Sequence, residues 1–474
     1  MASGFWSETD KPIRPGFYNR FKAAALARIQ MGKRGIVGMP VKANWGPVKK
    51  IERVTSEKDL INKYGSDMDY TAYKLGRLVL LGGPKELLLY RLTDGKEKPA
   101  TLTLKAGEKD VLKLDTIYPT TRDFKITIEP NILDEDLVNM VLYEGSRPLF
   151  TFKKLEGTAE EVAETINKNA ENKWLVATAL EKDSEEQIKL EPIVSVAMTG
   201  GNDGTGEIAV DDYIEAMGEF EGRNINGFSL DGVTTLSLQT SVAAWVDRNR
   251  KAGKKIRAYM GGTEEETLEE AIKKAKTTNN EAVMYVGAVG GILDEIEYTP
   301  AETACYIMGL GEGQDMKECL ANEVTVFQDV TRHLSHEEVE DSILGGVMVL
   351  VEDDGAIVVE DDVNTLTRYG QDQNEIWGNL RAIKFLDMVD EDTSSTGNKQ
   401  YVGNVLNGTN GQLAVLTALK KYFETLKSAE LIEDFTVEID EELQANAASD
   451  EFYWVWDAKY INVMKKIFGT GYIR

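Results

Sequence analysis

Three consecutive segments decide the fold prediction: Lys255-Ile-Arg-Ala-Tyr-Met260, then residues 264–277, then Ala282-Val-Met-Tyr-Val-Gly-Ala-Val289. The first and third are short apolar runs that predict strands, and the second predicts a helix. The same alternation extends in both directions, with strands expected at residues 225–230, 323–327 and 346–351 and helices at residues 239–250 and 299–310. Alternation of this length predicts a mostly parallel sheet covered by helices.

The segment before this sheet begins with residues that favour an extended arm. Residues 1–20 contain Pro12, Pro15 and Gly16 and show no helical period. An arm of that length spans roughly 60 Å when fully extended, far enough to reach another subunit. Phe17, Tyr18 and Phe21 are its expected anchors. Strands at 34–41 and 86–91 and helices at 56–64, capped by Ser56, and 70–81 follow.

Residues 100–198 have a different texture. Short alternating segments at residues 101–104, 124–128, 137–143 and 193–198 are separated by Asp, Gly and Pro turns, and a helix is expected at residues 158–168. Spacing of this kind predicts a small β domain. The glycine-rich stretch at residues 199–206 then predicts a domain boundary.

The C-terminal section combines two predicted helices, residues 375–389 and 411–427, with terminal strands. In the second helix Leu416, Leu419, Phe423 and Leu426 form an apolar stripe, which favours a core position over a docking face for a partner. A strand is expected at 435–440. A further strand is expected after it, in which Phe452, Trp454 and Trp456 share one face.

The last residues are unusual for a chain terminus. Termini are commonly polar and poorly ordered unless something holds them, whereas Phe468, Tyr472 and Ile473 keep this one apolar almost to its end. Such a segment requires a sheet edge to pair with, in its own subunit or in a neighbour.

Composition restricts the class of protein. Of the 474 residues, 42% are hydrophobic and 28% are charged, which is typical of a globular protein. No apolar run approaches 18 residues, and the N-terminus lacks the pattern of a signal peptide. We therefore expect that the chain does not insert into a membrane and that it is synthesised in a cytoplasm. Two cysteines fit a reducing compartment best.

The formal charge of −26 is distributed unevenly. Residues 1–55 hold eleven Lys or Arg against three acids, a net of +8, while residues 430–458 hold ten acids and no Lys or Arg. The overall acidity argues against nucleic-acid binding. Solubility is one interpretation of the charge. The other is that the basic start and the acidic end attract each other, within a subunit or between subunits.

We find no set of residues that predicts catalysis. The two histidines, His333 and His336, have H-x-x-H spacing rather than the H-E-x-x-H of zinc proteases, and Ser335 with Glu338 predicts a capping box that places His336 in a first helical turn. We therefore expect no metal, no cofactor and no enzymatic activity.

Three other motifs favour structural roles. The loop at residues 199–206 lacks the lysine of a phosphate-binding loop. The acid clusters at residues 352–354 and 360–362 lack EF-hand spacing, which favours solvated turns between strands. Cys305 lies within a predicted helix beside Ala304 and Met308, which favours an inert core thiol.

Six stretches together resemble a known family. They are Arg14-Pro-Gly-Phe-Tyr-Asn-Arg-Phe21, Arg34-Gly-Ile-Val-Gly-Met-Pro40, Gly200-Gly-Asn-Asp-Gly-Thr205, Trp245-Val-Asp-Arg-Asn-Arg-Lys-Ala-Gly-Lys254, the expected helix start Tyr401-Val-Gly-Asn-Val405, and Val463-Met-Lys-Lys-Ile-Phe-Gly-Thr-Gly-Tyr-Ile473. In this order the chain resembles the tail sheath proteins of contractile bacteriophage tails, in particular those of Gram-positive phages and PBSX-like defective prophages. No single stretch is specific, and the joint order carries the likeness.

The resemblance implies a structural protein that polymerises as helically stacked hexameric rings around an inner tail tube. Contraction would drive that tube through the target cell envelope, with baseplate and tail terminator proteins as further partners. The implied location is a virion tail or a phage-tail-like particle, assembled in the bacterial host cytoplasm. A non-contractile ring or shell protein is the alternative, and an enzyme with a subtilisin-like core is a third, disfavoured reading.

The implied fold is α/β and α+β multidomain. It comprises an arm (1–20), a segment packing with the core (21–98), a β-sandwich insertion (99–198), a subtilisin-like α/β middle domain (199–360) and a C-terminal α+β domain with a terminal strand arm (361–474). The residues expected at subunit interfaces are Phe17, Tyr18, Phe21, Phe452, Trp454, Phe468, Tyr472 and Ile473.

Overall fold

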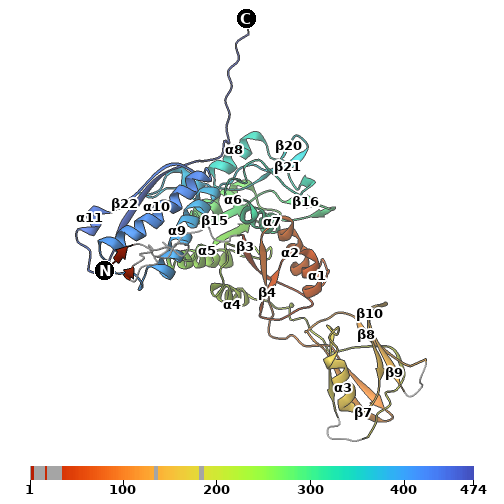
Figure 1. The fold of residues 1–474 in the computed structure, drawn as a ribbon. Coiled ribbons are helices and arrows are strands. Elements are labelled where there is room, and N and C mark those ends of the chain that lie inside the picture. The colour runs from red at the N-terminus through yellow and green to blue at the C-terminus, as the bar shows by residue number, and fades with distance from the viewer. Residues whose placement is uncertain (1, 5–15, 19–34, 133–136, 181–185, 474) are drawn as a thin grey trace. The chain divides into compact units, whose positions relative to one another are not determined.

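The computed structural model describes residues 2–4, 16–18, 35–132, 137–180 and 186–473 (Figure 1). The chain divides into two compact units, Arg34–Ile383, and Met1–Lys33 together with Lys384–Arg474. The fold is a mixed α/β multidomain arrangement that includes a β-sandwich.

The larger unit is organised around a six-stranded sheet with the order β15-β14-β13-β3-β5-β4. Neighbouring strands run parallel except β4, which is antiparallel to β5. The strands are β3 (Ile36–Val41), β4 (Ile51–Val54), β5 (Glu86–Arg91), β13 (Gly227–Ser229), β14 (Arg257–Gly261) and β15 (Val283–Val286). The predicted parallel sheet is therefore confirmed for the strands expected at residues 225–230, 255–260 and 282–289, although these are shorter than expected. The strands expected at 323–327 and 346–351 lie outside it, in a small antiparallel sheet.

Six helices accompany this sheet. They are α1 (Glu57–Tyr64), α2 (Thr71–Leu81), α4 (Val210–Glu221), α5 (Leu236–Lys251), α6 (Leu268–Thr278) and α7 (Pro300–Gly313). Helix α7 packs on β3, β13, β14 and β15 and against α2. The two helices approach closely at Gly309, where a Cβ atom would lie only 2.2 Å from the Val79 carbonyl oxygen.

Local capping explains where several helices begin. Ser56 caps α1, and Thr299 with Glu302 forms a capping box around Pro300 at the start of α7, both as predicted. The prediction for α6 began too early, because Thr267 and Glu270 form the capping box and the helix starts at Leu268. Helix α4 was not predicted.

The β-sandwich has two sheets, with orders β10-β9-β8-β12 and β11-β7-β6. Its elements are β6 (Thr101–Ala106), β7 (Lys109–Thr116), β8 (Phe124–Pro130), β9 (Val138–Glu144), β10 (Arg147–Leu155), α3 (Ala159–Lys168), β11 (Leu175–Ala179) and β12 (Ile193–Ala197). Their inward residues form a core of their own, so the predicted β domain is confirmed. Trp45, from the connection between β3 and β4, also belongs to this core. Its ring lies edge-on to the ring of Tyr118, with the two ring centroids 5.2 Å apart.

Small sheets complete the larger unit. One contains β16 (Gly291–Leu293), β17 (Ile296–Glu297) and β19 (Asp329–Val330). The other contains β18 (Glu323–Val324), β20 (Leu350–Asp353) and β21 (Ala356–Val359). Helix α8 (His336–Leu344) lies between β19 and β20 in the sequence. The strand expected at residues 346–351 begins only at Leu350. Gly346 adopts φ +70°, a turn conformation that delays the extended chain.

The C-terminal unit contains a hairpin and two long helices, the first of which begins four residues earlier, within the larger unit. They are α9 (Leu380–Gln400), α10 (Thr409–Ser428), β22 (Ile432–Ile439) and β23 (Trp454–Tyr460), with the short helix α11 (Glu441–Gln444) between the strands. A 3-10 turn, η1 (Glu375–Gly378), precedes α9, so that helix begins later than predicted. The apolar stripe of α10 is buried, which confirms its core role.

Candidate functional site

The two histidines lie on the surface among acids. His333 is 59% exposed at its side chain, with Nε2 3.5 Å from an Asp329 carboxylate oxygen. His336 is the first residue of α8, behind the Ser335–Glu338 capping box, which confirms the predicted position. Among the residues that the structure describes, no group of three or more His, Cys, Asp or Glu side chains is arranged to hold a metal ion.

The two acid clusters have different environments. Residues 352–354 are exposed at the turn between β20 and β21, where Asp354 has φ +48°, so this cluster is a solvated turn as predicted. The second cluster was predicted in the same way, and that prediction is wrong. Asp362 is 1% exposed, and its carboxylate accepts a hydrogen bond from the Arg381 backbone N–H (3.2 Å) at the start of α9. Asp362 therefore caps a helix.

The glycine-rich loop at residues 199–206 forms hydrogen bonds with other segments of the protein. The Asp203 carboxylate accepts hydrogen bonds from the Tyr70 hydroxyl (2.7 Å) and the Thr121 hydroxyl (3.0 Å). Its carbonyl oxygen accepts one from the buried Arg91 guanidinium at 2.9 Å. The loop thus ties together segments that are distant in sequence.

Cys305 is an inert core thiol. It is fully buried in α7, and its sulfur lies 3.2 Å from the Leu230 carbonyl oxygen. Burial raises the pKa of the thiol to about 12, so the reactive thiolate is scarce at neutral pH.

The C-terminal hairpin has an inner and an outer face. Along β23 the residues alternate between half-buried and exposed, with Trp454 and Trp456 half-buried and Val455 exposed, as predicted. The rings of Trp456 and Phe435 lie 5.1 Å and 5.6 Å from that of Phe423 on α10, which covers the inner face. These aromatic contacts fix the hairpin on its helix.

The hairpin forms a sheet with two outer edges. In the described part of the chain its sheet consists of β22 and β23 alone. Within the described residues no other strand pairs with the outer edge of β22 or of β23, and a strand edge presents N–H and C=O groups that can pair with another chain. The hairpin sequence is also strongly acidic, with ten acids in residues 430–458.

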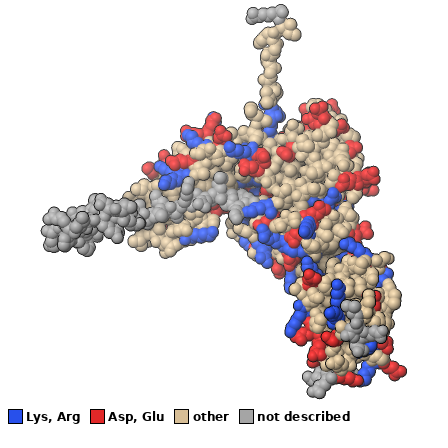
Figure 2. Space-filling view, turned by 45° about the vertical axis from the view of Figure 1, so that its right-hand side comes forward, with Lys and Arg blue, Asp and Glu red and all other residues tan. Residues whose placement is uncertain are grey.

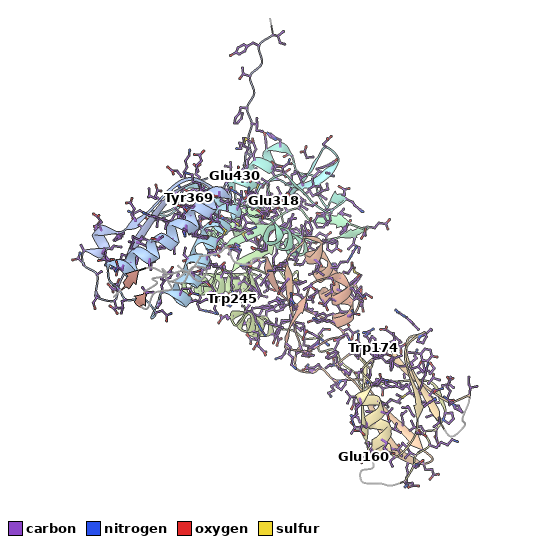
Figure 3. The ribbon with its side chains drawn as sticks, viewed as in Figure 1. Glu160, Trp174, Trp245, Glu318, Tyr369 and Glu430 are labelled. Atoms are coloured by element: carbon purple, nitrogen blue, oxygen red, sulfur yellow. The ribbon has the colours of Figure 1, made fainter. Side chains whose placement is uncertain are left out.

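The tail after the hairpin is exposed. Residues 461–473 have no regular secondary structure (Figure 3). Phe468, Tyr472 and Ile473 are 91%, 88% and 103% exposed, and Met464 and Ile467 exceed 80%. Among the described residues no strand pairs with this tail, so the expectation that residues 468–473 form a strand with a neighbouring subunit stays a prediction. Exposed apolar side chains at this density indicate a segment that binds elsewhere.

The N-terminal arm is described only in part. Ala2–Gly4 (β1) pairs in parallel with Gly16–Tyr18 (β2), so these two segments lie side by side and the arm is not fully extended in the single chain. Phe17 and Tyr18 lie in β2 opposite Ser3 and Gly4. Phe21 lies outside the described residues.

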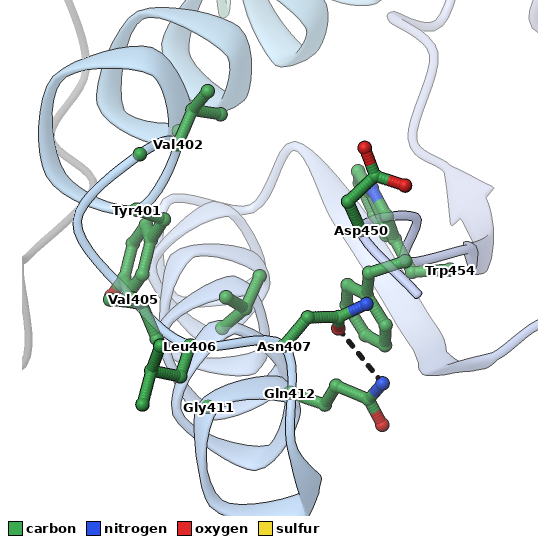
Figure 4. Close-up of a pocket in the computed structure, with 13 residues that line it drawn as sticks. Tyr401, Val402, Val405, Leu406, Asn407, Gly411, Gln412, Asp450 and Trp454 are labelled. Carbon is green, nitrogen blue, oxygen red and sulfur yellow. Dashed lines mark hydrogen bonds between the residues drawn. The ribbon is translucent and has the colours of Figure 1, made fainter. Parts of the chain in front are cut away.

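A hollow of about 390 Å³ lies beside the start of β23 (Figure 4). Tyr401, Val402 and Leu406, from the connection between α9 and α10, line it across from Trp454. The Asn407 amide closes one side by donating hydrogen bonds to the Ser449 and Glu451 carbonyl oxygens at 3.1 Å and 2.8 Å. Phe452 lines the same hollow, so two of the predicted interface residues, Phe452 and Trp454, come together there.

Sequence reasoning missed the other wall of this hollow. Tyr401 was expected to open a helix, but residues 401–405 form turns after α9 ends at Gln400, because Gly403 takes φ +74°. The available signal was the apolar content of this loop. Val402, Val405 and Leu406 stand between glycines, and the structure leaves them 66%, 40% and 90% exposed.

Charge on the surface is mixed. On the face shown in Figure 2, acidic and basic side chains are interspersed. None of the described helices is both long and apolar enough to cross a membrane.

Comparison with known proteins places this architecture. Four family models match in succession: the tail sheath protein Gp18 domain III N-terminal region (residues 34–92), the phage tail sheath β-sandwich domain (93–203), the phage tail sheath central domain (206–365) and the phage tail sheath C-terminal domain (372–474). Together they cover the chain from residue 34 to its end with only short gaps.

Individual relatives agree over nearly the whole length. The phage-like element PBSX protein XkdK of Bacillus subtilis is 24% identical over 472 residues, 95% of each chain. The crystal structure of a sheath tail protein from Desulfitobacterium hafniense superposes with a TM-score of 0.73 at 22% identity, covering 94% of this chain and all of that one. The helical sheath of the anti-feeding prophage in its contracted state superposes with a TM-score of 0.55 at 12% identity, covering 98% and 99%. The chain therefore belongs to the phage tail sheath protein family, and its role is that of a structural protein in a contractile tail.

Proposed function

We propose that this protein polymerises as helically stacked hexameric rings around an inner tail tube and contracts to drive that tube through the envelope of a target cell. The observation that carries the proposal is that one chain has both a two-stranded hairpin with unpaired edges among its described residues and an exposed apolar tail. A relative of the same fold forms a helical sheath in a contracted state, and another is part of a baseplate.

The tail would complete the hairpin of a neighbour. Addition of a strand satisfies the main-chain groups along an open edge and buries the side chains on one face of the added strand. Phe468, Tyr472 and Ile473 are the residues of this arm, and Phe452 and Trp454 belong to the surface that receives it. Phe17, Tyr18 and Phe21 would serve the N-terminal arm in the same way.

Strand exchange suits a lattice that moves. Main-chain hydrogen bonds between an arm and its receiving sheet persist while compact units rotate, provided that the connections flex. Gly469 and Gly471, and the segment from Pro12 to Gly16, are suited to that task. The energy for contraction would be stored in the extended lattice as a less stable packing, so no nucleotide hydrolysis is required.

The charge distribution supports the direction of these contacts. The first 55 residues carry a net +8, and the hairpin sequence carries ten acids. A basic start on one subunit and an acidic hairpin on the next attract each other in a head-to-tail arrangement, which generates rings or helices. For the tube-facing surface we propose helix α10 and the acidic residues 430–442.

We further propose that the middle domain is a subtilisin-like fold without enzymatic activity. The domain limits would be 1–20, 21–98, 99–198, 199–360 and 361–474. Besides itself, the inner tube protein, the baseplate and a tail terminator would be its partners, without direct nucleic-acid contact or membrane insertion. Assembly would take place in the bacterial host cytoplasm, before the sheath functions in a virion tail or phage-tail-like particle.

Truncation tests the proposal. Removal of residues 1–18, or of the last eight residues, should leave a folded monomer that cannot form long tubes in electron micrographs. Tubes of normal length from either truncated chain would refute strand exchange. Contraction has its own readout, because a contractile sheath shows two tube lengths and diameters from one subunit, whereas a static shell shows one.

A further inference from the structure

The tail presents two aromatic side chains on one face. In an extended chain alternate residues point to opposite faces, so Phe468, Thr470 and Tyr472 share one face, and Ile467, Gly469, Gly471 and Ile473 share the other. Phe468 and Tyr472 would then stand about 13 Å apart. Both are almost fully exposed in the single chain.

The C-terminal unit offers two adjoining hollows. The first, of about 390 Å³, is the hollow bounded by Tyr401, Val402, Leu406 and Trp454. The second, of about 220 Å³, shares Tyr401, Val402 and Trp454 with it and continues along α9 to Thr393. The two hollows thus meet at a common wall.

We propose that these hollows are sockets for Phe468 and Tyr472 from the tail of a second copy of this chain. The proposal rests on the strand exchange proposed above and names the residues that anchor it. An added strand that carries two aromatic side chains into preformed apolar hollows gains a fixed register, which main-chain pairing alone does not supply.

Charge complementarity identifies the tail as the occupant. Residues 459–474 contain three lysines and one arginine and no acid, whereas residues 430–458 contain ten acids and no Lys or Arg. Asp450 lies at the lining of the larger hollow. The basic, apolar tail therefore matches the acidic hairpin on which the sockets lie.

Geometry favours a second copy over the chain's own tail. The sockets lie at Trp454, the first residue of β23, and the strand then runs about 20 Å away from them to Tyr460. The Ile461 backbone N–H donates to the Leu431 carbonyl oxygen at 3.0 Å, which continues the hairpin pairing in the same direction. To fill its own sockets, the tail would have to reverse within residues 461–467, where Asn462 is the one residue of a turn-forming type.

Matched alanine variants test the anchors. The variant F468A/Y472A should raise the concentration needed for tube formation by about thirtyfold or more, as expected for loss of an interface anchor. The control I467A/I473A removes apolar side chains from the opposite face and should raise it much less. Melting temperatures should match the parent chain, because these side chains are exposed in the monomer. Equal effects of the two double variants would refute the proposal that Phe468 and Tyr472 bind in these hollows.

Disulfide trapping locates the anchors directly. Two full-length chains, each with Cys319→Ser, would carry one new cysteine each: Val402→Cys in the wall shared by the sockets, and Thr470→Cys between the two anchors. After co-assembly and oxidation with copper phenanthroline, we expect a covalent heterodimer on a non-reducing gel. Because each chain carries a single new cysteine, this link can form only between two copies.

A third chain, Val455→Cys on the outer face of β23, separates the possible failures. If tubes form and Thr470→Cys links to Val455→Cys but not to Val402→Cys, the sockets are refuted and strand exchange stands. If chains that lack the last eight residues still form tubes, strand exchange itself is refuted.

Discussion

The six-stranded sheet of the larger unit and the C-terminal hairpin differ in how far one chain completes them. In β3, five of six residues are buried, and helices such as α7 pack on the sheet. In β23 every second residue is exposed, and the sheet stops at two strands in the described part of the chain. The larger unit covers its sheet with its own helices, whereas we propose that residues of another copy complete the hairpin.

This contrast separates stability from assembly. Substitutions in the finished region should unfold the protein, because tightly packed interiors adapt poorly to lost atoms. Substitutions in the open region should leave the monomer folded and weaken contacts between copies. The four predictions below test this division.

The largest effect is expected at a buried ion pair in the larger unit. Glu312 on α7 accepts hydrogen bonds from Arg257 at 2.7 Å and 2.8 Å and from the Tyr259 hydroxyl at 2.8 Å, with both charged side chains at most 2% exposed. Glu312→Ala leaves Arg257 charged in the interior and should lower the free energy of unfolding by about 3–5 kcal/mol, measured by urea denaturation. Glu207→Ala, which breaks the exposed pair with Lys96, is the matched control and should change nothing measurable. A loss below about 1 kcal/mol for Glu312→Ala would contradict a self-sufficient core.

The hairpin should respond locally to loss of Trp456. Its ring packs 5.1 Å from Phe423, and it is half-buried. Trp456→Ala should therefore cost about 2 kcal/mol, less than a fully buried aromatic, and should speed hydrogen exchange in β22 and β23 while leaving β14 and β15 protected. Val455→Ala on the exposed face should have little effect. Equal loosening of both units would show that they unfold as one.

Salt should weaken assembly more than it weakens the monomer. If the basic start and tail of one copy meet the acidic hairpin of another, raising the salt concentration screens the exposed pairs. Light scattering should then show a higher concentration threshold for tubes at high salt, with an unchanged melting temperature. A threshold independent of salt would assign the charge to solubility alone.

The smallest effect concerns thiol labelling. Cys305 should resist a thiol reagent at pH 8 in the native protein, because burial raises the pKa of its thiol to about 12, and it should react only after unfolding. Phe468→Cys in the exposed tail should react at once in the monomer and slowly in tubes. Rapid labelling of native Cys305 would indicate that the larger unit opens more readily than its packing implies.

The sequence predicted best what a single segment determines. Strands buried on both faces, such as β5 and β14, appear as continuous apolar runs, and the capping boxes of α7 and α8 mark their starts. Strand β7 was missed although its segment, Lys109–Thr116, alternates apolar and charged residues in the way that predicts a half-buried strand.

The hollow beside β23 could not be predicted from local pattern. Its walls, Tyr401 and Trp454, lie far apart in the sequence, and only the packing of α9, α10 and the hairpin brings them together. The tail illustrates the opposite case. Its apolar sequence was recognised, but no described strand of the single chain pairs with it, so its bound conformation stays a prediction.

Hydrogen exchange of the tail amides, residues 462–473, in monomers and in assembled tubes tests the central claim most directly. We predict fast exchange in the monomer, where the tail has no regular structure, and strong protection in tubes, where main-chain pairing with a neighbour would hold it. Fast exchange in both states would contradict the account, because a tail that remains unpaired in the tube cannot complete the hairpin of another copy.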